Sequence, residues 1–553
     1  MTNKPKISKK KTYWWNKWTG GALLILILVL TPIFTILIKL FDTPGEHWNH
    51  ISSHLLPTYF FNSFILLFGV GIFTFIIGVS MAWFVSIYSF PGRRYFEWLL
   101  ILPVAFPSYM MGYSYVGILE YTGPIQAFFR NNFDLHFTGP IIDIMNLPGA
   151  VFILSLSLFP YVYVICRASF MRQSNEMQEA AFILGSSRFR MFTKVALPMA
   201  RPAVAGGLAL VSMEVLNDYG TVKYFGVDTF TSGIFRAWFS LGDINTAIYL
   251  SAILTLFVLI LIWLENFQRG NRSWTSQAKS TRPSLRITPN RRSRWLLTFL
   301  CLFVLVISFL LPLSQLFYWA SLTWREVIDS EFVILILRSF SLAIGSAVLI
   351  ALFSIFLLYA VRLSPLRWTK YITRIASSGY AIPGAVIAVG VMIPMMELDK
   401  LFIWASNNQT GMILSGTIFI LVFAYIVRFM AVGYNAIDAG FQKTGTSVNE
   451  VARSLGASPA RTLWKVDLPL IRNSIAAAIL LAFVDILKEL PLTLILRPFN
   501  FHTLATKAFD MATNEMIAES ANASLVVVLT GIIPVIILNS VISQRSKGTP
   551  DKR

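Results

Sequence analysis

The chain has 553 residues, of which 56% are hydrophobic and only 13% are charged, whereas about a quarter of the residues in an ordinary soluble domain are charged. This composition excludes a soluble globular enzyme and predicts an all-α membrane protein surrounded by lipid. The formal net charge of +19 does not indicate nucleic acid as a partner, because Lys and Arg gather in alternate loops between apolar stretches, which is the positive-inside pattern.

The apolar stretches predict membrane spans along the whole chain. The first follows a basic leader, Lys4 to Lys17, and it is too long for the hydrophobic region of a signal peptide, so we expect it to be retained. A span needs roughly 20 apolar residues. About twelve candidates meet this need, at residues 20–42, 61–90, 97–120, 147–171, 201–222, 246–266, 294–320, 333–361, 372–396, 411–437, 473–496 and 519–542.

The basic residues predict the orientation. With a cytoplasmic N-terminus, the cytoplasmic segments hold the basic clusters at 93–94, 269–294, 362–374 and 545–553, and the outer segments hold few basic residues. Twelve spans therefore place both termini in the cytoplasm.

A segment rich in Ser, Thr, Pro, Arg and Lys divides the chain into two halves. We expect it to be a cytoplasmic linker, because it contains no apolar run. The expected domains are a leader, first span and outer loop at 1–60, a first half at 61–267, the linker at 268–293, a seventh span and outer loop at 294–332, a second half at 333–543 and a tail at 544–553.

One cytoplasmic loop occurs in both halves. The first copy contains Glu179, Ala180, Ala181, Gly185, Leu197 and Pro198, and the second contains Glu450, Ala452, Gly456, Leu468 and Pro469, each 271 positions after its counterpart. Other pairs match at 276 positions, namely 62–64 with 338–340 and Pro107 with Pro383. Internal repeats of this kind in membrane proteins are typical of transporters. The alternative is an ordinary amphipathic helix at the membrane surface.

Charged residues follow each loop inside a predicted span. The first span carries Glu214, Asn217 and Asp218, and the second carries Asp485, Lys488 and Glu489. The carboxylates of each helix are four residues apart and share one face. A carboxylate in a membrane is costly unless it faces a cavity or a partner. We expect these six residues to line a substrate pathway, or alternatively to hold the bundle together by pairing with Lys488, Arg497 or Lys223.

The repeated loop resembles the EAA motif of ABC importer permeases. Val451 replaces the middle Ala of the second copy. The stretches 214–239 and 485–506 resemble the fused two-domain permeases of ferric-iron importers, and thiamine permeases are close relatives with the same layout. The resemblance implies two tandem MetI-like, type I halves related by a pseudo-two-fold axis, in the bacterial cytoplasmic (inner) membrane.

The resemblance also implies the partners. The loops with Glu179 and Glu450 would dock on cytoplasmic ABC ATPase subunits, in two copies, and an outer solute-binding protein would deliver the substrate. The sequence Gly440 to Ser447 resembles a phosphate-binding loop, but Thr446 stands where Lys is needed and an apolar helix is expected before it. We therefore expect this chain to be no enzyme and to bind no cofactor, with ATP used by the partner.

The substrate follows from the resemblance and not from the charges. Carboxylates suit Fe³⁺, which is a hard cation. Thiamine and other small cations are also positive, and Lys488 reduces the negative charge. An ion-coupled secondary transporter, in which the carboxylates carry protons, is a further alternative. A structural membrane scaffold would leave the symmetric carboxylates unexplained.

Histidines and cysteines offer no firm metal site. His47, His50 and His54 share roughly one helical face, which a metal could use, although a polar face at the membrane surface is the simpler interpretation. His136 and His502 also fall in predicted outer segments. Cys166 and Cys301 lie in apolar spans, and we expect both to be small buried hydrophobic residues.

Overall fold

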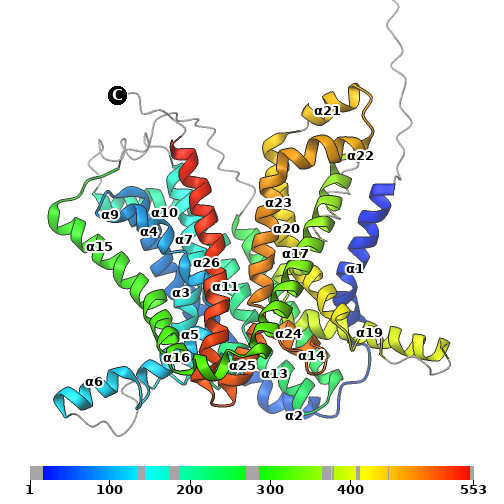
Figure 1. Ribbon diagram of the computed structural model, residues 1–553, viewed down its shortest axis with the longest axis horizontal. Helices are drawn as coiled ribbons and strands as arrows, with labels where there is room; N and C mark the ends of the chain where they lie inside the picture. The colour runs from blue at the N-terminus through cyan, green and yellow to red at the C-terminus, as the bar shows by residue number, and fades with distance from the viewer. Residues whose placement is uncertain are drawn as a thin grey trace, which may run out of the picture. The chain divides into compact units, whose positions relative to one another are not determined.

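A computed structural model describes residues 17–134, 143–173, 187–269, 286–363, 371, 375, 379–406, 412–445 and 447–547 (Figure 1). These residues are almost entirely helical, as the composition predicts. The helices are α1 (Lys17–Lys39), α2 (Trp48–His50), α3 (Leu56–Ile87), α4 (Arg93–Leu99), α5 (Ser108–Leu119), α6 (Pro124–Phe133), α7 (Leu147–Arg172), α9 (Arg188–Met191), α10 (Leu197–Met199), α11 (Arg201–Asn217), α12 (Gly220–Tyr224), α13 (Phe230–Phe235), α14 (Ile244–Arg269), α15 (Arg291–Leu305), α16 (Leu311–Val327), α17 (Ser330–Leu363), α19 (Gly384–Ala405), α20 (Ile418–Thr444), α21 (Ser447–Ser454), α22 (Pro459–Thr462), α23 (Leu468–Leu487), α24 (Pro491–Leu496), α25 (Leu504–Thr513) and α26 (Ile517–Lys547).

Nine helices within the described ranges are long and apolar enough to cross a membrane, and two bent pairs raise the number to eleven. One of the bent pairs corrects a prediction, and the other lies just before the span expected at 201–222. The span expected at 97–120 bends by 94° between residues 93–105 and 108–133, and the helices 188–199 and 201–217 meet at 70°. Pro107 explains the first bend, because a proline restricts the preceding residue to extended conformations. The span expected at 372–396 falls partly outside the described residues, and its described part holds a 3₁₀ turn at Gly379–Ala381 and then the start of α19 at Gly384.

Two predicted spans end earlier than expected. Helix α11 stops at Asn217 and α23 stops at Leu487, and each is followed by a shorter helix, α12 or α24. The charged residues at these ends supply the reason, because carboxylates that accept backbone N–H groups start a new helix there. The site below is built on these interruptions.

The chain forms two compact units by its internal contacts. One contains residues 1–33, 343–380 and 422–486, and the other contains 34–342, 381–421 and 487–553. In the first unit, α17 and α20 approach closely, since a Cβ added at Gly433 would lie 2.7 Å from Ile350 Cγ2. Small residues at helix crossings allow such close packing in membranes.

The second unit is organised around α7. Helices α3 and α11 both pack on α7, and both use a glycine to do so: Gly78 and Gly207 face Val162. The last helix, α26, packs on α16 and α25. Cys166 on α7 and Cys301 on α15 are fully buried and unpaired in disulfides, as predicted.

Candidate functional site

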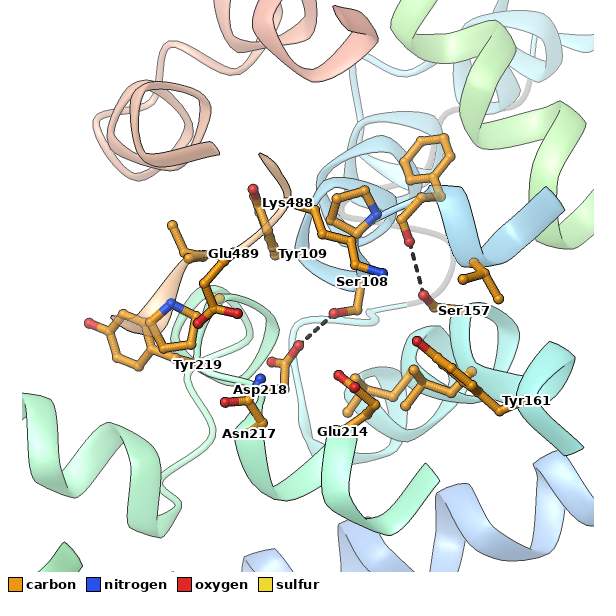
Figure 2. A pocket seen from close by; sticks show the side chains of 18 residues that line it. Ser108, Tyr109, Ser157, Tyr161, Glu214, Asn217, Asp218, Tyr219, Lys488 and Glu489 are labelled. Atoms are coloured by element: carbon orange, nitrogen blue, oxygen red, sulfur yellow. Dashed lines mark hydrogen bonds between the residues drawn. The ribbon is translucent and has the colours of Figure 1, made fainter. Parts of the chain in front are cut away.

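A cavity of about 90 Å³ in the second unit brings predicted pathway residues together (Figure 2). Glu214, Asn217, Asp218, Lys488 and Glu489 all line it, although they are far apart in the chain. Asp485 does not line this cavity. Polar residues that the sequence did not single out complete the wall, chiefly Ser108, Tyr109, Ser157, Tyr161 and Tyr219.

Asp218 is bonded to the protein on several sides. It follows α11, and its carboxylate accepts the backbone N–H groups of Thr221 and Val222, at 2.9 and 3.2 Å, as well as the Thr221 hydroxyl at 2.9 Å. The Ser108 hydroxyl donates to the same carboxylate at 2.5 Å. Asp218 therefore caps the start of α12 and links it to α5 through Ser108. It also lines the cavity.

Glu489 repeats this arrangement in the second half. Its carboxylate accepts the Leu492 N–H at 3.2 Å, at the start of α24, and the Thr493 hydroxyl donates to its backbone carbonyl at 3.0 Å. Its side chain is 6% exposed. The match between Asp218 and Glu489 in the sequence thus becomes a match in geometry, because each carboxylate begins the short helix that interrupts its span.

Helix α5 begins at the cavity, and α19 begins beside two of the residues that line it. Pro107 precedes α5 and Pro383 precedes α19, with nearly the same ψ angles of 136° and 141°. The Gly384 N–H donates to the Asn217 side chain at 2.7 Å. A Cβ at Gly384 would lie only 2.7 Å from Glu489 Oε1, so a glycine is needed here. The positive N-terminal ends of these helices favour the carboxylates beside them.

Glu214 occupies a different part of the wall. It lies inside α11, one turn before Asp218, and Figure 2 shows it facing the same space as Tyr161 of α7. Ser157, also on α7, donates to the Phe106 carbonyl at 3.0 Å. This part of the cavity combines a carboxylate with hydroxyl groups, which are suitable oxygen ligands for a hard cation.

The alternative of bundle-holding ion pairs fails for Arg497. This residue donates to Asp510 at 2.8 Å and to His502 Nδ1 at 2.9 Å, which leaves it bonded to neither Asp218 nor Glu489 in any of these contacts. Lys223 is exposed. The capping bonds of Asp218 and Glu489 nevertheless show that these two residues also have a structural task.

Residues 228–236 and 502–510 form a second matched pair, which the sequence analysis missed. Thr229 with Ser232 and Thr503 with Thr506 each make a capping box at the start of α13 and α25. These residues are 274 positions apart, whereas the loops are 271 apart, so a search at a fixed offset passes over them. A search that allowed a three-residue insertion would have found them.

His502 provides a pH-dependent contact. Burial and the neighbouring Arg497 lower the pKa of His502, and the donation from Arg497 to Nδ1 requires the neutral ring. Because the pKa is lower in the folded protein, the unfolded chain takes up a proton at a higher pH than the folded protein does. Acidification therefore favours the unfolded chain, and stability is lost as the pH falls. We expect the loss of thermal stability from about pH 7.5 to about pH 5.5 to be smaller in His502→Gln. An equal loss in both proteins would contradict this.

The three N-terminal histidines do not converge. His47 Nδ1 lies 3.3 Å from Asp243, and the rings of His50 and His54 stack at 4.9 Å. In the described parts of the chain, no group of three or more His, Cys, Asp or Glu residues could hold a metal ion. His136 lies outside the described residues.

The second copy of the repeated loop forms a helix with an exposed apolar face. Glu450 is exposed on α21, beside Val448 and Val451, which are 44% and 59% exposed, and Leu455 follows at 84%. Gly456 then takes φ +86°, a left-handed conformation that glycine adopts without strain. An apolar ridge of this kind on a short helix is typical of a docking surface.

A buried network braces this segment. Asp467 is 4% exposed, and it accepts hydrogen bonds from Arg362 at 3.1 Å and from the Asn449 amide at 2.8 Å. Arg362 also donates to the Gly445 carbonyl, and the Tyr359 hydroxyl donates to the Pro459 carbonyl at 2.6 Å. The network links both ends of α21 to α17, so the exposed ridge is held by a rigid base.

The first copy of the loop is described only at its end. Glu179, Ala180, Ala181 and Gly185 lie outside the described residues. Leu197 and Pro198 begin α10, and Leu468 and Pro469 begin α23, so both copies lead into the next helix through a Leu-Pro pair. A proline in the first helical turn is tolerated because its missing N–H would have no partner there.

Comparison with known proteins identifies the family. The model of the binding-protein-dependent transport system inner membrane component matches residues 74–273 and 357–548, which together exceed half of the chain. The chain belongs to this family. The two separate matches confirm two permease halves fused in tandem. This permease is a multi-pass protein of the inner membrane and a transport component.

Similar proteins support the resemblance to ferric permeases. The Fe(3+)-transport system permease protein FbpB 2 of Haemophilus influenzae is 25% identical over 86% of this chain and 88% of its own length. The ferric transport system permease protein FbpB of Actinobacillus pleuropneumoniae is 23% identical over 86% of this chain and 71% of its own. The sulfate transport system permease protein CysT of Salmonella typhimurium is 25% identical over 37% of this chain and 72% of its own.

Proposed function

We propose that this chain is the permease of an ATP-driven importer that moves ferric iron into the cytoplasm. The observation that carries the proposal is the small cavity lined by Glu214, Asp218 and Glu489, with Lys488 as the one cation that the described part of the chain adds to its wall. Carboxylate and hydroxyl oxygens are the ligands that hard cations prefer. Relatives that match this permease over most of its length are named for ferric transport.

The size of the cavity supports a small ion. Its volume of about 90 Å³ is well below the roughly 300 Å³ at which pockets for drug-sized molecules begin. A buried water needs about 10–15 Å³ of such space, so the cavity suits an ion with several water molecules. Thiamine, with two rings, fits this space poorly.

Sulfate is the competing substrate, because a sulfate permease matches 37% of the chain. The N-terminus of α5 at the cavity, and that of α19 beside it, would favour an anion. Their positive ends, however, already face carboxylates, and three carboxylates against one lysine give the wall a net negative charge. An anion would be repelled from such a wall.

The transport cycle follows from partners at both faces. An outer solute-binding protein delivers iron, and two cytoplasmic ATPase subunits dock on the segments that contain Glu179 and Glu450. ATP binding draws these segments together and changes the side to which the cavity opens. The chain itself binds no cofactor and breaks no bond. Its contribution is a difference in stability between two conformations, which the partners shift. Both termini lie in the cytoplasm.

ATP hydrolysis by the reconstituted permease–ATPase complex tests the proposal. The solute-binding protein is added loaded with Fe³⁺, thiamine or sulfate. Stimulation by the iron-loaded protein alone is expected. Stimulation by either of the other two alone would keep the architecture and overturn the substrate. Uptake that continues without the ATPase would favour an ion-coupled secondary transporter.

The linker at 268–293 gives a further expectation. If it only joins the halves, cutting the chain between residues 270 and 285 and co-expressing the two parts retains uptake. The cut must stay before Ile287, because this residue pairs with the end of α3 through its N–H and the Ile87 carbonyl at 3.0 Å. Complete loss of uptake by assembled parts would show that the linker has a function of its own.

A further inference from the structure

A second, larger cavity adjoins the carboxylate cavity. It has a volume of about 610 Å³ and lies among segments that the charge pattern places on the outer side. Its wall is mainly aromatic, with Phe235, Phe239, Phe499, Phe501 and Phe509, and it also holds Arg497, His502 and Asp510. Among the described residues, Tyr219 alone lines both cavities. The Tyr219 side chain therefore stands between them.

The Tyr219 ring is held between two phenylalanines. It stacks on Phe235 with ring centroids 3.6 Å apart and contacts Phe509 at 5.8 Å. Phe509 in turn meets Tyr109, which lines the carboxylate cavity, at 6.1 Å. All four rings are less than 9% exposed. Packed rings without gaps exclude water and ions, so this cluster closes the route between the cavities.

The two phenylalanines hold equivalent positions in the two halves. Phe235 is the sixth residue after the Thr229 cap of α13, and Phe509 is the sixth after the Thr503 cap of α25. Tyr219 has no such counterpart in the cluster, because Leu490 stands 271 positions later. The cluster is thus formed by one residue from each half around a single tyrosine.

Each phenylalanine is followed by a residue in an ion pair. Arg236 pairs with Asp228 at 2.5 Å and donates to the Tyr59 hydroxyl at 3.2 Å. Asp510 pairs with Arg497 at 2.8 Å, and the His502 ring nitrogen Nδ1 lies 3.2 Å from the same carboxylate. Arg236 and Asp510 hold equivalent positions after the two phenylalanines, so the charge at this position is reversed between the halves. These pairs hold the phenylalanines in place from the outer side.

We propose that Tyr219, Phe235 and Phe509 form the outer gate of the transport path, and that the Arg236–Asp228 and Asp510–Arg497 pairs are its latches. The gate deepens the proposed function, since it controls access to the same carboxylate cavity. The structure holds it closed. Separation of α13 from α25 pulls the two phenylalanines off Tyr219 and joins the cavities. Neither half can open the gate alone, because either phenylalanine still covers the tyrosine.

A thiol-labelling experiment tests the gate without any substrate. The reporter is Ser157→Cys, which lines the carboxylate cavity, and the native Cys166 and Cys301 are buried and give the background. A membrane-impermeant thiol reagent is added to the outer side of vesicles that contain the permease–ATPase complex. We expect slow labelling with the intact gate, and labelling at least roughly tenfold faster when Phe235→Ala and Phe509→Ala are combined, which corresponds to about 1.4 kcal/mol.

Phe499→Ala is the matched control. Phe499 lines the same outer cavity, but it is fully exposed at 101% and should leave the rate unchanged. If the double alanine variant fails to assemble, Phe235→Leu with Phe509→Leu removes the ring stacking and keeps apolar volume, and the same increase is expected. Arg236→Ala should give a smaller increase by releasing one latch.

An unchanged rate in an assembled double variant would overturn the gate, and so would an equal increase with Phe499→Ala. The labelling needs no iron. A complex that labels as expected but is not stimulated by the iron-loaded binding protein therefore keeps the gate and rejects the substrate.

Discussion

Glu214→Gln is expected to reduce iron uptake by roughly ten- to a hundredfold while the permease–ATPase complex still assembles. Glu214 lies inside α11 and lines the cavity, away from the helix end that Asp218 caps. A hydrogen bond or contact to a charged group contributes about 1.5–3 kcal/mol, and each 1.4 kcal/mol is a factor of ten. Uptake of ⁵⁵Fe into vesicles measures the effect, and co-purification with the ATPase measures assembly.

Asp218→Ala is the matched comparison, and it should behave differently. This substitution removes the acceptor for the Ser108 hydroxyl and for two N–H groups of α12. Each buried donor left without a partner costs about 1–3 kcal/mol. We therefore expect a lower melting temperature and poor assembly in addition to lost uptake. If Asp218→Ala assembles normally but loses uptake, Asp218 serves the pathway and has no structural task. If Glu214→Gln keeps normal uptake, Glu214 is not part of the pathway.

Glu179→Ala combined with Glu450→Ala is expected to weaken binding of the ATPase by roughly a hundredfold or more. Glu450 is exposed on α21 beside an apolar ridge, and the buried Asp467 network holds that helix in place. Truncating one partner of a charged pair at an interface costs about 2–5 kcal/mol. Co-purification from detergent and ATP hydrolysis in vesicles report the loss.

The control for this prediction is Ser454→Ala on the same helix. Its hydroxyl donates to the Val451 carbonyl of its own turn at 2.8 Å and is exposed, so its removal should leave docking unchanged. Unaltered co-purification and uptake in the double glutamate variant would show that the repeated loops are ordinary surface helices. The single variants Glu179→Ala and Glu450→Ala measure the contribution of each copy separately. This matters because only Glu450 lies in a described helix.

Hydropathy and charge were enough to predict the membrane class and most of the spans, because burial in lipid requires long apolar runs. They could not place the helix breaks. The ends of α11 and α23 depend on side-chain caps, and the hydropathy of the following residues gives no sign of them. The expected spans at 201–222 and 473–496 therefore ran through Asp218 and Glu489.

The cavity was predicted in part. The repeat pointed to Glu214, Asp218 and Glu489, since a fixed offset places residues at equivalent positions of two halves. The contact between Asn217 and the Gly384 backbone joins residues that are 167 positions apart, and no local pattern reveals it. Ser108, Tyr161 and Tyr219 were missed for the same reason, because uncharged polar residues inside apolar runs carry no distinctive sequence signal.

The ion pairs Asp228–Arg236 and Arg497–Asp510 have a consequence for how this permease can evolve. Each pair is closed within one half, so a mutation that changes its sign can be compensated a few residues away and needs no change in the other half. A transporter built from two identical subunits lacks this freedom, because every substitution appears twice. In a fused chain each half can change separately, so compensating changes in related chains are expected to fall within the same half.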